Sequence, residues 1–404
     1  MVKVGSAMLS HRTYVGVMVA MLIATTVGSL SVFVIGTVAR PIMDDLELGY
    51  GTMGVVISMQ RVASTLTAPF IGYAIDRIGP FKVLTIAMVF STFSLFLTPL
   101  SSKLWMLLLT RIIAGLVFPA YWPSCTKIAA VSIPKNRIGF ATAVFESGSV
   151  IGVVLTYILI PYARSWRFLF IIVAVIALLS LIMVSLLLPR NTKVEYRYLE
   201  RNRGSVVKDI GYSKLFRNTI IIFFAFLFAL QPWAFYTSWL STFLVEKFVV
   251  ELEDIWIPIS IFLVIGMAFG ILSSILSDKI HSLKGRKTIL VLTLVATSIA
   301  LFMLTVVEPG IYTWIFLAVS IISHRTFLPL AWTIINDTTP DKFVGLVSGV
   351  NALAGQISMM ITPIIIAYTR ESLGTFNISI VVLSIFTATS IPLYLQLKRI
   401  ETTQ

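Results

Sequence analysis

Long apolar runs separated by short polar turns are the main pattern of this sequence. The first run extends from about Tyr14 to Val38 and is longer than the apolar core of a signal peptide. Eleven further runs lie near residues 52–75, 82–100, 104–130, 138–160, 167–188, 218–244, 255–277, 287–307, 312–336, 343–368 and 375–396. A helix needs about 20 mainly apolar residues to cross a bilayer, and each run provides them. The pattern therefore predicts an all-α membrane protein with twelve transmembrane helices in two sets of six.

The charges of the turns predict how the chain is oriented. Basic turns hold Arg77 and Lys82, Lys135 and Arg137, Lys279, Lys284, Arg286 and Lys287, and Lys342. Acidic turns hold Asp44, Asp45 and Glu47, and Glu246, Glu251, Glu253 and Asp254. Lys and Arg accumulate in the cytoplasmic loops of membrane proteins. We therefore expect both termini to be cytoplasmic.

The stretch from Arg190 to Arg217 interrupts the apolar pattern. It holds eight Lys or Arg residues against three acidic residues, and it is too polar to lie in lipid. We interpret it as a cytoplasmic linker that rests on anionic headgroups. The chain is thereby divided into an N-terminal six-helix bundle (1–189), the linker (190–217) and a C-terminal six-helix bundle (218–404).

The composition supports a membrane location. Of the 404 residues, 57% are hydrophobic and 12% are charged, whereas soluble domains are about half apolar and a quarter charged. The formal charge of +13 would suggest a nucleic-acid partner for a soluble chain, but here the basic residues follow the topology. We expect a multi-pass protein of the plasma membrane that contacts lipid and no nucleic acid.

A tight polar turn stands between the second and third apolar runs. Its sequence, Gly72-Tyr-Ala-Ile-Asp76-Arg77-Ile-Gly79, places a charged pair where the chain must lie at a membrane interface. A related turn follows about two hundred residues later, with Asp278 and Lys279 and then Gly285. The two turns indicate an internal repeat.

These features resemble the major facilitator superfamily of secondary transporters. The resemblance includes the two six-helix halves, the basic linker and the repeated turn. It also includes a fourth-helix motif, Arg111-x-x-x-Gly115, followed by Pro123, Pro134 and Arg137. The resemblance covers essentially the whole chain. The chain departs from the family where Pro80-Phe81 replaces a basic pair and where extra residues separate Asp278 from Gly285.

The resemblance implies a transporter that works by alternating access. Its gating motif would consist of Gly72, Asp76, Arg77, Gly79, Arg111, Gly115 and Asp278. Asp76 would hold its turn against the start of helix 11, near Lys342, because a carboxylate is stabilised at a helix N-terminus. The alternative is that Asp76 and Arg77 only anchor helix 2 at the interface. For Arg111, early in the fourth helix, a structural role and a gating role both fit.

Charged residues inside the predicted spans are candidates for the substrate site, because a charge in the membrane is unfavourable and usually faces a cavity. At about 1.5 Å per residue, Arg61 lies about 22 Å, Glu146 about 13 Å and Arg325 about 18 Å from the cytoplasmic side. We expect Arg61 and Arg325 to bind an anionic substrate and Glu146 to take a coupling proton. A purely structural buried pair is the alternative for Glu146 and Arg325.

Other polar residues add to these candidates. We expect Gln231 and Tyr236 on helix 7, together with Tyr121 on helix 4, to face the substrate, and Trp239 to lie in an aromatic belt at the outer interface. Pro232 permits a bend in helix 7. Lys127 is expected to extend to the cytoplasmic surface. Arg40, at the outer end of helix 1, either guards the mouth or anchors the helix.

The sequence favours a secondary active transporter for a small organic anion, a carboxylate, that enters with a proton and acts as a monomer. The alternatives are a proton-driven exporter of amphipathic compounds or drugs, and a membrane receptor of the same fold that does not transport. No nucleophile and base, phosphate-binding loop or metal-ligand spacing points to an enzyme. With one cysteine, Cys125, and three histidines, we expect no disulfide, metal or cofactor.

Overall fold

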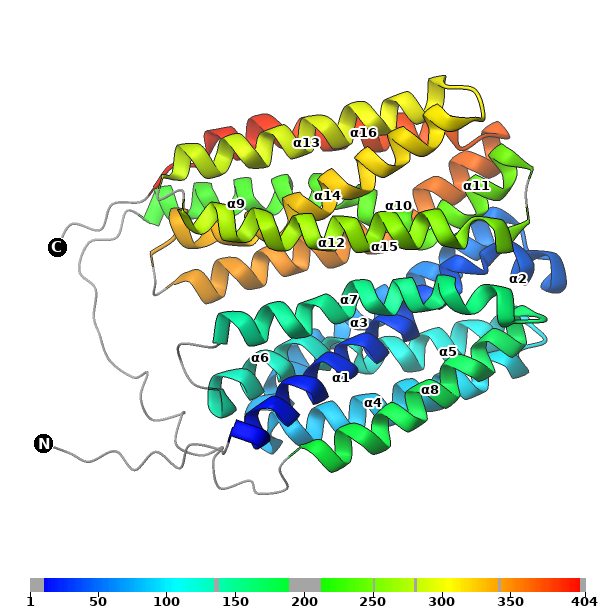
Figure 1. Cartoon of the computed structure of the whole chain (residues 1–404), viewed down its shortest axis with the longest axis horizontal. Helices are drawn as coiled ribbons and strands as arrows, with labels where there is room; N and C mark the ends of the chain where they lie inside the picture. The colour runs from blue at the N-terminus through cyan, green and yellow to red at the C-terminus, as the bar shows by residue number, and fades with distance from the viewer. Residues whose placement is uncertain are drawn as a thin grey trace, which may run out of the picture. The chain divides into compact units, whose positions relative to one another are not determined.

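The computed structural model describes residues 11–133, 138–188, 212–249, 251–279, 282–340 and 343–399 (Figure 1). Within these ranges every regular element is a helix, as the apolar pattern predicts. The α-helices up to residue 188 are α1 (His11–Thr37), α2 (Ala39–Leu46), α3 (Tyr50–Ile78), α4 (Pro80–Leu97), α5 (Leu104–Val117), α6 (Tyr121–Ser132), α7 (Ile138–Leu159) and α8 (Trp166–Leu187). Short 3₁₀ turns are η1 (Thr98–Leu100), η2 (Phe118–Ala120) and η4 (Ile160–Tyr162).

The part of the chain described after residue 211 is also helical. Its helices are α9 (Tyr212–Ala229), α10 (Gln231–Ser238), α11 (Leu240–Phe248), α12 (Trp256–Lys279), α13 (Leu283–Val306), α14 (Ile311–Thr338), α15 (Val344–Leu373) and α16 (Asn377–Gln396), with the 3₁₀ turn η6 (Leu252–Asp254) before α12. The predicted seventh span is thus divided into α9, α10 and α11. The first break lies at Pro232, which stands in the first turn of α10 and has no N–H to continue the bonding of α9.

Eleven helices of the described residues are long and apolar enough to cross a membrane. The predicted span 52–75 is not among them, although α3 has 29 residues and a length of about 43 Å. Its polar residues, among them Gln60 and Arg61, lower its hydropathy. The helical membrane fold is therefore confirmed, while the count of twelve spans and the cytoplasmic termini stay predictions.

The ends of several helices follow from local chemistry. Gly79 adopts a φ of 96° before Pro80, the first residue of α4, so the last glycine of the polar turn has a conformation that side-chain-bearing residues rarely adopt. Helices α2 and α11 both end in a left-handed residue, Glu47 (φ 52°) and Val249 (φ 54°). The interval between these two residues equals that between Asp76 and Asp278. The backbone therefore repeats with the same period as the sequence motif.

The chain contains two compact units. The first consists of Met1–Val34, Leu66–Thr156 and Tyr162–Gly204; the second consists of Ile35–Thr65, Tyr157–Pro161 and Ser205–Gln404. Residues 35–65, which include α2 and the first half of α3, therefore pack with the C-terminal helices. The sequence-based boundary in the linker 190–217 stays a prediction, since most of that linker lies outside the described residues.

Each unit has its own helix packing. In the first unit, α4 packs against α5, α6 and α8. Gly148 and Gly152 bring α7 close to α1, where the Thr25 hydroxyl donates to the Phe145 carbonyl oxygen at 2.6 Å. In the second unit, α14 packs against α12 and α13, and α16 packs against α9 and α13 (Figure 1).

Candidate functional site

Helix α10 contributes two of the predicted site residues to the interior of the second unit. Gln231 and Tyr236 are buried. The Gln231 Oε1 atom accepts a hydrogen bond of 2.6 Å from Thr362 on α15, and the Tyr236 hydroxyl bonds to Ser320 on α14. These contacts give α10 a fixed orientation between two long helices. A direct contact of either residue with substrate stays a prediction.

Arg325 on α14 packs against two glycines of α12, Gly266 and Gly270. Its guanidinium stacks over the ring of Trp233, 4.6 Å from the centroid, which is a cation–π contact. Gly266 on α12 faces the arginine stem, and a Cβ there would lie 3.0 Å from the Arg325 Cβ and Cγ atoms. The adjacent His324 points elsewhere, with Nε2 3.1 Å from the Ala229 carbonyl oxygen. The structure thus holds a guanidinium beside an indole at mid-helix.

Arg61 on α3 is also held inside the second unit. It is buried, and its Nη1 atom donates to the Gln356 Oε1 atom of α15 at 3.3 Å. Gln356 and Thr362 are on the same helix, so α15 receives both Arg61 and Gln231. Two of the predicted substrate residues are therefore joined to one helix.

Glu146 and Tyr121 belong to the first unit. Glu146 is exposed on α7. Tyr121 is fully buried and packs against Gly28 of α1, where an added Cβ would lie 2.9 Å from the tyrosine ring. This position gives Tyr121 a packing role in the first unit, and its contact with substrate stays a prediction. The pairing of Glu146 with Arg325 also stays a prediction, because they lie in different compact units.

Arg111 has the contacts of a structural residue. It is fully buried, donates to the Ser31 carbonyl oxygen at 3.2 Å and to Thr98 Oγ1 at 2.6 Å, and stacks over Phe170 at 5.6 Å. These partners lie on α1, η1 and α8. Arg111 therefore joins three elements to α5, in which Gly115 is also buried.

Asp76, in the polar turn from Gly72 to Gly79, has a partner that we did not predict. Asp76 forms an ion pair with Lys127 of α6, with 2.8 Å between Oδ1 and Nζ. Arg77 stacks over Tyr73 at 5.3 Å, and a Cβ at Gly72 would meet no atom within 4 Å. The expected partner region of Asp76 includes Lys342, which lies outside the described residues. The latch against helix 11 therefore stays a prediction.

The second polar turn has a similar ion pair with the charges reversed. Arg286, in the first turn of α13, pairs with Asp337 near the end of α14, with 2.6 Å between Nη1 and Oδ1. The Asp278 side chain, at the end of α12, lies outside the described part of the structure. In both units a turn between two helices is therefore held to the end of a third helix by a charged pair.

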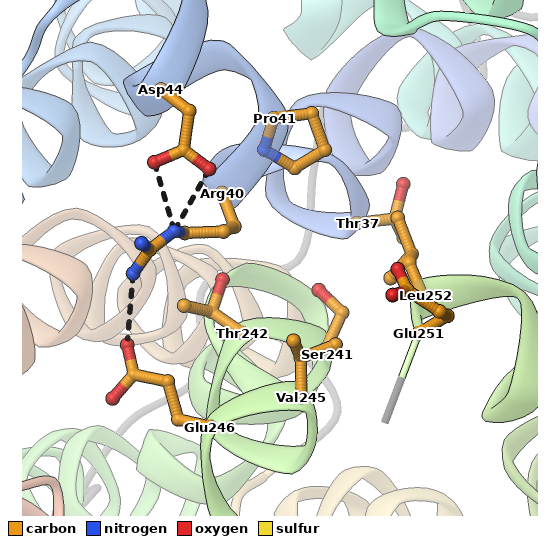
Figure 2. A pocket seen from close by; sticks show the side chains of 10 residues that line it. All are labelled: Thr37, Arg40, Pro41, Asp44, Ser241, Thr242, Val245, Glu246, Glu251 and Leu252. Atoms are coloured by element: carbon orange, nitrogen blue, oxygen red, sulfur yellow. Dashed lines mark hydrogen bonds and ion pairs between the residues drawn. The ribbon is translucent and has the colours of Figure 1, made fainter. Parts of the chain in front are cut away.

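Sequence reasoning missed a cluster of five residues, which we call the α2–α11 cluster: Arg40, Asp44, Tyr50, Glu246 and Arg370. All five lie in the second unit. Arg40 Nε bonds to Asp44, and Figure 2 shows this contact. Arg40 Nη1 donates to the Tyr50 hydroxyl at 3.1 Å. Arg370 Nε donates to Glu246 Oε2 at 2.9 Å, and the Tyr50 hydroxyl bonds to Glu246 Oε1. The sequence marked Arg40 at the outer end of helix 1 and Asp44 and Glu246 in acidic turns. Their meeting with Tyr50 and Arg370 was not visible, because the five residues are spread over more than three hundred positions of the chain.

The hydrogen bonds within this cluster change the pKa values of its members. The hydrogen bond to Asp44 raises the pKa of Arg40. Burial raises the pKa of Tyr50, and the hydrogen bond to Glu246 raises it further.

Trp239 lies next to the cluster, with its ring centroid 5.8 Å from that of Tyr50. Its indole N–H donates to the Pro363 carbonyl oxygen at 3.0 Å. Trp239 is completely buried, so its predicted place in an interfacial belt is wrong.

A cavity of about 360 Å³ adjoins the cluster. Figure 2 shows the residues that line it, among them Arg40, Glu246 and Glu251 with the hydroxyl side chains of Ser241 and Thr242. This volume lies within the range of small-molecule sites, about 300–1,000 Å³. The cavity is therefore large enough for a small organic acid.

Comparison with known proteins gives the same picture of the fold. The model of the Major Facilitator Superfamily matches residues 21–399. The chain is 24% identical over 410 residues to the probable galactarate/D-glucarate transporter GarP of Escherichia coli K12, covering 92% of this chain and 91% of that protein. It is 21% identical over 363 residues to the probable sulfoacetate transporter SauU of Cupriavidus necator, covering 85% and 84%. The crystal structure of a D-xylose-proton symporter has a TM-score of 0.78, 15% identity, and coverage of 97% and 99%.

Proposed function

We propose, since this chain belongs to the Major Facilitator Superfamily of membrane transporters, that it moves a small organic anion with a carboxylate group across the plasma membrane together with a proton. The protein is a multi-pass membrane transporter and not an enzyme. Two relatives are named for galactarate or D-glucarate and for sulfoacetate, and these compounds are organic anions that bear carboxylates. The substrate class proposed for this chain is the same.

The observation that supports an anionic substrate is the placement of Arg61 and Arg325. Both guanidinium groups lie on long helices of one compact unit, Arg61 against an amide and Arg325 against an indole. A guanidinium in a medium of low dielectric attracts a carboxylate strongly and binds it with two parallel hydrogen bonds. In this proposal Arg61 and Arg325 bind the anion, and Gln231 and Tyr236 position α10 beside it.

The proposed coupling uses the other predicted residues. Glu146 is the carboxyl group that takes the proton, and neutralisation of its charge accompanies the movement between the two access states. The turn at Asp76 and Arg77 stabilises one of these states. Rocking of one part of the chain around a central site is the general mode of such folds.

The test is uptake of labelled compounds into proteoliposomes that contain the purified full-length protein. The compounds are D-glucarate, sulfoacetate, the neutral polyol D-glucitol and the lipophilic cation tetraphenylphosphonium, each with and without an inward proton gradient. We expect uptake of at least one anion, stimulated by the gradient, and no uptake of D-glucitol. Proton-driven movement of the cation alone would instead establish the exporter. Binding of an anion without flux would establish the receptor.

A further inference from the structure

We propose that Arg40, Tyr50 and Arg370 form a binding site for the carboxylate of the transported anion, and that Glu246 occupies this site as an internal substitute until the anion displaces it. The inference rests on the proposed function, because it states where a carboxylate substrate first binds. It concerns the α2–α11 cluster and the adjoining cavity, and it is separate from the roles of Arg61 and Arg325.

The Glu246 carboxylate is surrounded as a bound carboxylate ligand would be. Its Oε2 atom lies 2.9 Å from both Nε and Nη2 of Arg370. Its Oε1 atom bonds to the Tyr50 hydroxyl and lies 3.7 Å from Arg40 Nη1. Two guanidinium groups and a phenol provide the planar, charge-assisted donors that recognise a carboxylate.

This set of donors is held in place by contacts other than Glu246. The Arg370 guanidinium stacks over the rings of Tyr50, at 4.8 Å, and Phe376, at 5.6 Å. Arg40 is fixed by its ion pair with Asp44, 2.9 Å away. Tyr50 packs against Trp239 and Phe376. The donors therefore keep their arrangement when Glu246 leaves, and a site prepared in this way binds its ligand with little loss of entropy.

The cavity offers room for the rest of such a ligand. Glu246 and Arg40 lie in its wall, so a carboxylate that enters the cavity reaches both. Thr242, also in the wall, is buried to 1% exposure, and its hydroxyl has no hydrogen-bond partner among the described residues. An unpaired buried hydroxyl is unfavourable, and a hydroxyl group of the ligand would pair with it. The ligand class is therefore a small hydroxy-carboxylate.

The charge around the cavity explains why displacement is required. Glu246 contacts Arg40, Tyr50 and Arg370, and it shares the cavity wall with Asp44 and Glu251. The Glu371 carboxylate lies nearby, where it accepts from the Gly51 N–H at 2.9 Å. The carboxylates of this region therefore outnumber its two arginines, and a further anion would meet net negative charge. When Glu246 moves away from the two arginines, the incoming carboxylate restores the original balance. Binding of the anion and departure of Glu246 are therefore one exchange.

The exchange has a consequence for access to the transporter. Glu246 on α11 is bonded to Tyr50 of α3 and Arg370 of α15, so its departure removes these contacts of α11, while the bound carboxylate keeps α3 and α15 joined. On the predicted topology these residues lie at the outer end of the membrane spans. Arrival of the substrate carboxylate would therefore loosen the outer closure, whereas a neutral polyol would not.

The first experiment measures the dissociation constants of D-glucarate and sulfoacetate for the purified full-length protein by calorimetry. The variant is Glu246→Gln and the matched control is Glu251→Gln, which removes a carboxylate from the same cavity without touching the arginines. We expect Glu246→Gln to bind the preferred anion about tenfold more tightly, since a hydrogen-bonded charged competitor is lost. Glu251→Gln removes one negative charge from the cavity wall but no competitor, so its gain should be at most about twofold. An equal gain in both variants would show a general charge effect and overturn the inference.

Failure of the inference and failure of the proposed function give different results. If the native protein binds an anion and Glu246→Gln does not change its affinity, the displacement is wrong and anion transport stands. If neither anion binds or moves in any form of the protein, the proposed substrate class is wrong.

A second measurement does not depend on the folding of the Glu246 variant. Cys125 is the single cysteine, so Ser238→Cys in a Cys125→Ser background gives one thiol at a buried position where α10 meets Gly36. We expect D-glucarate or sulfoacetate, and not D-glucitol, to increase labelling of this thiol by a membrane-impermeant maleimide. An unchanged labelling rate with an anion that binds would contradict the exchange.

Discussion

Lys127 of α6 and Asp76 at the turn between α3 and α4 form an ion pair, with 2.8 Å between Nζ and Oδ1. The same ammonium group donates to the Ile75 carbonyl oxygen at 3.2 Å. The lysine therefore holds the C-terminal end of α3 to α6 within one compact unit. Asp76, which we predict to act in gating, thus has a partner inside its own unit.

Asp76→Asn should slow transport about tenfold, equivalent to about 1.4 kcal/mol, because it removes the charge that stabilises one access state. The folded protein should lose at most about 1 kcal/mol, since the carboxylate is 64% exposed and exposed ion pairs contribute little. Initial uptake rates and thermal unfolding measure the two effects. Lys82→Met, at an exposed position of the same turn, is the control. Unchanged flux in Asp76→Asn would remove the latch.

Arg325→Gln should weaken anion binding by about 10- to 100-fold, since a hydrogen bond to a charged group contributes about 1.5–3 kcal/mol. The matched control is Arg167→Gln on α8, because Arg167 also stacks on a tryptophan, Trp166, at 4.3 Å. Titration of the ligand-induced shift in unfolding temperature gives the affinities. An undiminished shift in Arg325→Gln would make this arginine structural.

Glu146→Gln should abolish accumulation driven by a pH gradient and leave anion exchange intact, because the amide cannot take up the coupling proton. Uptake with an imposed gradient and counterflow at equal pH measure the two activities in the same vesicles. Glu308→Gln, an exposed carboxylate between α13 and α14, should behave as the native protein. Proton-driven uptake that survives in Glu146→Gln would assign coupling to another group.

Gly152→Ala should destabilise the first unit by about 1–3 kcal/mol through overpacking. The added Cβ would lie 2.5 Å from Ser29 Cβ and 2.8 Å from the Thr26 carbonyl oxygen of α1. Gly349→Ala, in helix α15 with no atom within 4 Å of the new Cβ, should be neutral or stabilise by up to about 1 kcal/mol. Thermal unfolding in detergent compares the two. Equal unfolding temperatures of the Gly152→Ala and Gly349→Ala variants would contradict this prediction, because they would show that α1 and α7 move apart at little cost.

Most of the helices were predictable from the sequence, because local hydropathy determines which segments can span a membrane. Runs of about 20 apolar residues must be helical in lipid, since no water is present to bond the backbone. The break at Pro232 and the special backbone of Gly79 also depend on single residues and their neighbours. The family assignment from the repeated turn and the Arg111 motif is confirmed over residues 21–399.

The candidate site was predicted less completely. Arg61, Gln231 and Tyr236 were identified as polar residues in apolar runs, and the structure gives them partners on α14 and α15. The predicted position of Trp239 in an interfacial belt was wrong. A tryptophan ring is amphipathic, so the residue type fits an interface and a buried site with a hydrogen-bond acceptor equally well. The contact of Lys127 with Asp76 was missed, because the side chain of a lysine near a helix end reaches either solvent or a neighbouring carboxylate.

The sequence by itself determined that this protein is a helical membrane transporter, because hydropathy and turn chemistry act over tens of residues. Only the tertiary structure decided that Tyr50, Glu246 and Arg370 meet in one cluster. Water solvates a charged residue in a polar turn as well as an oppositely charged side chain does. The residues next to each of these charges therefore do not show that the three side chains will be in contact. Packing of α2 and α3 against α11 and α15 brings these distant charges together, and only that packing makes them a site.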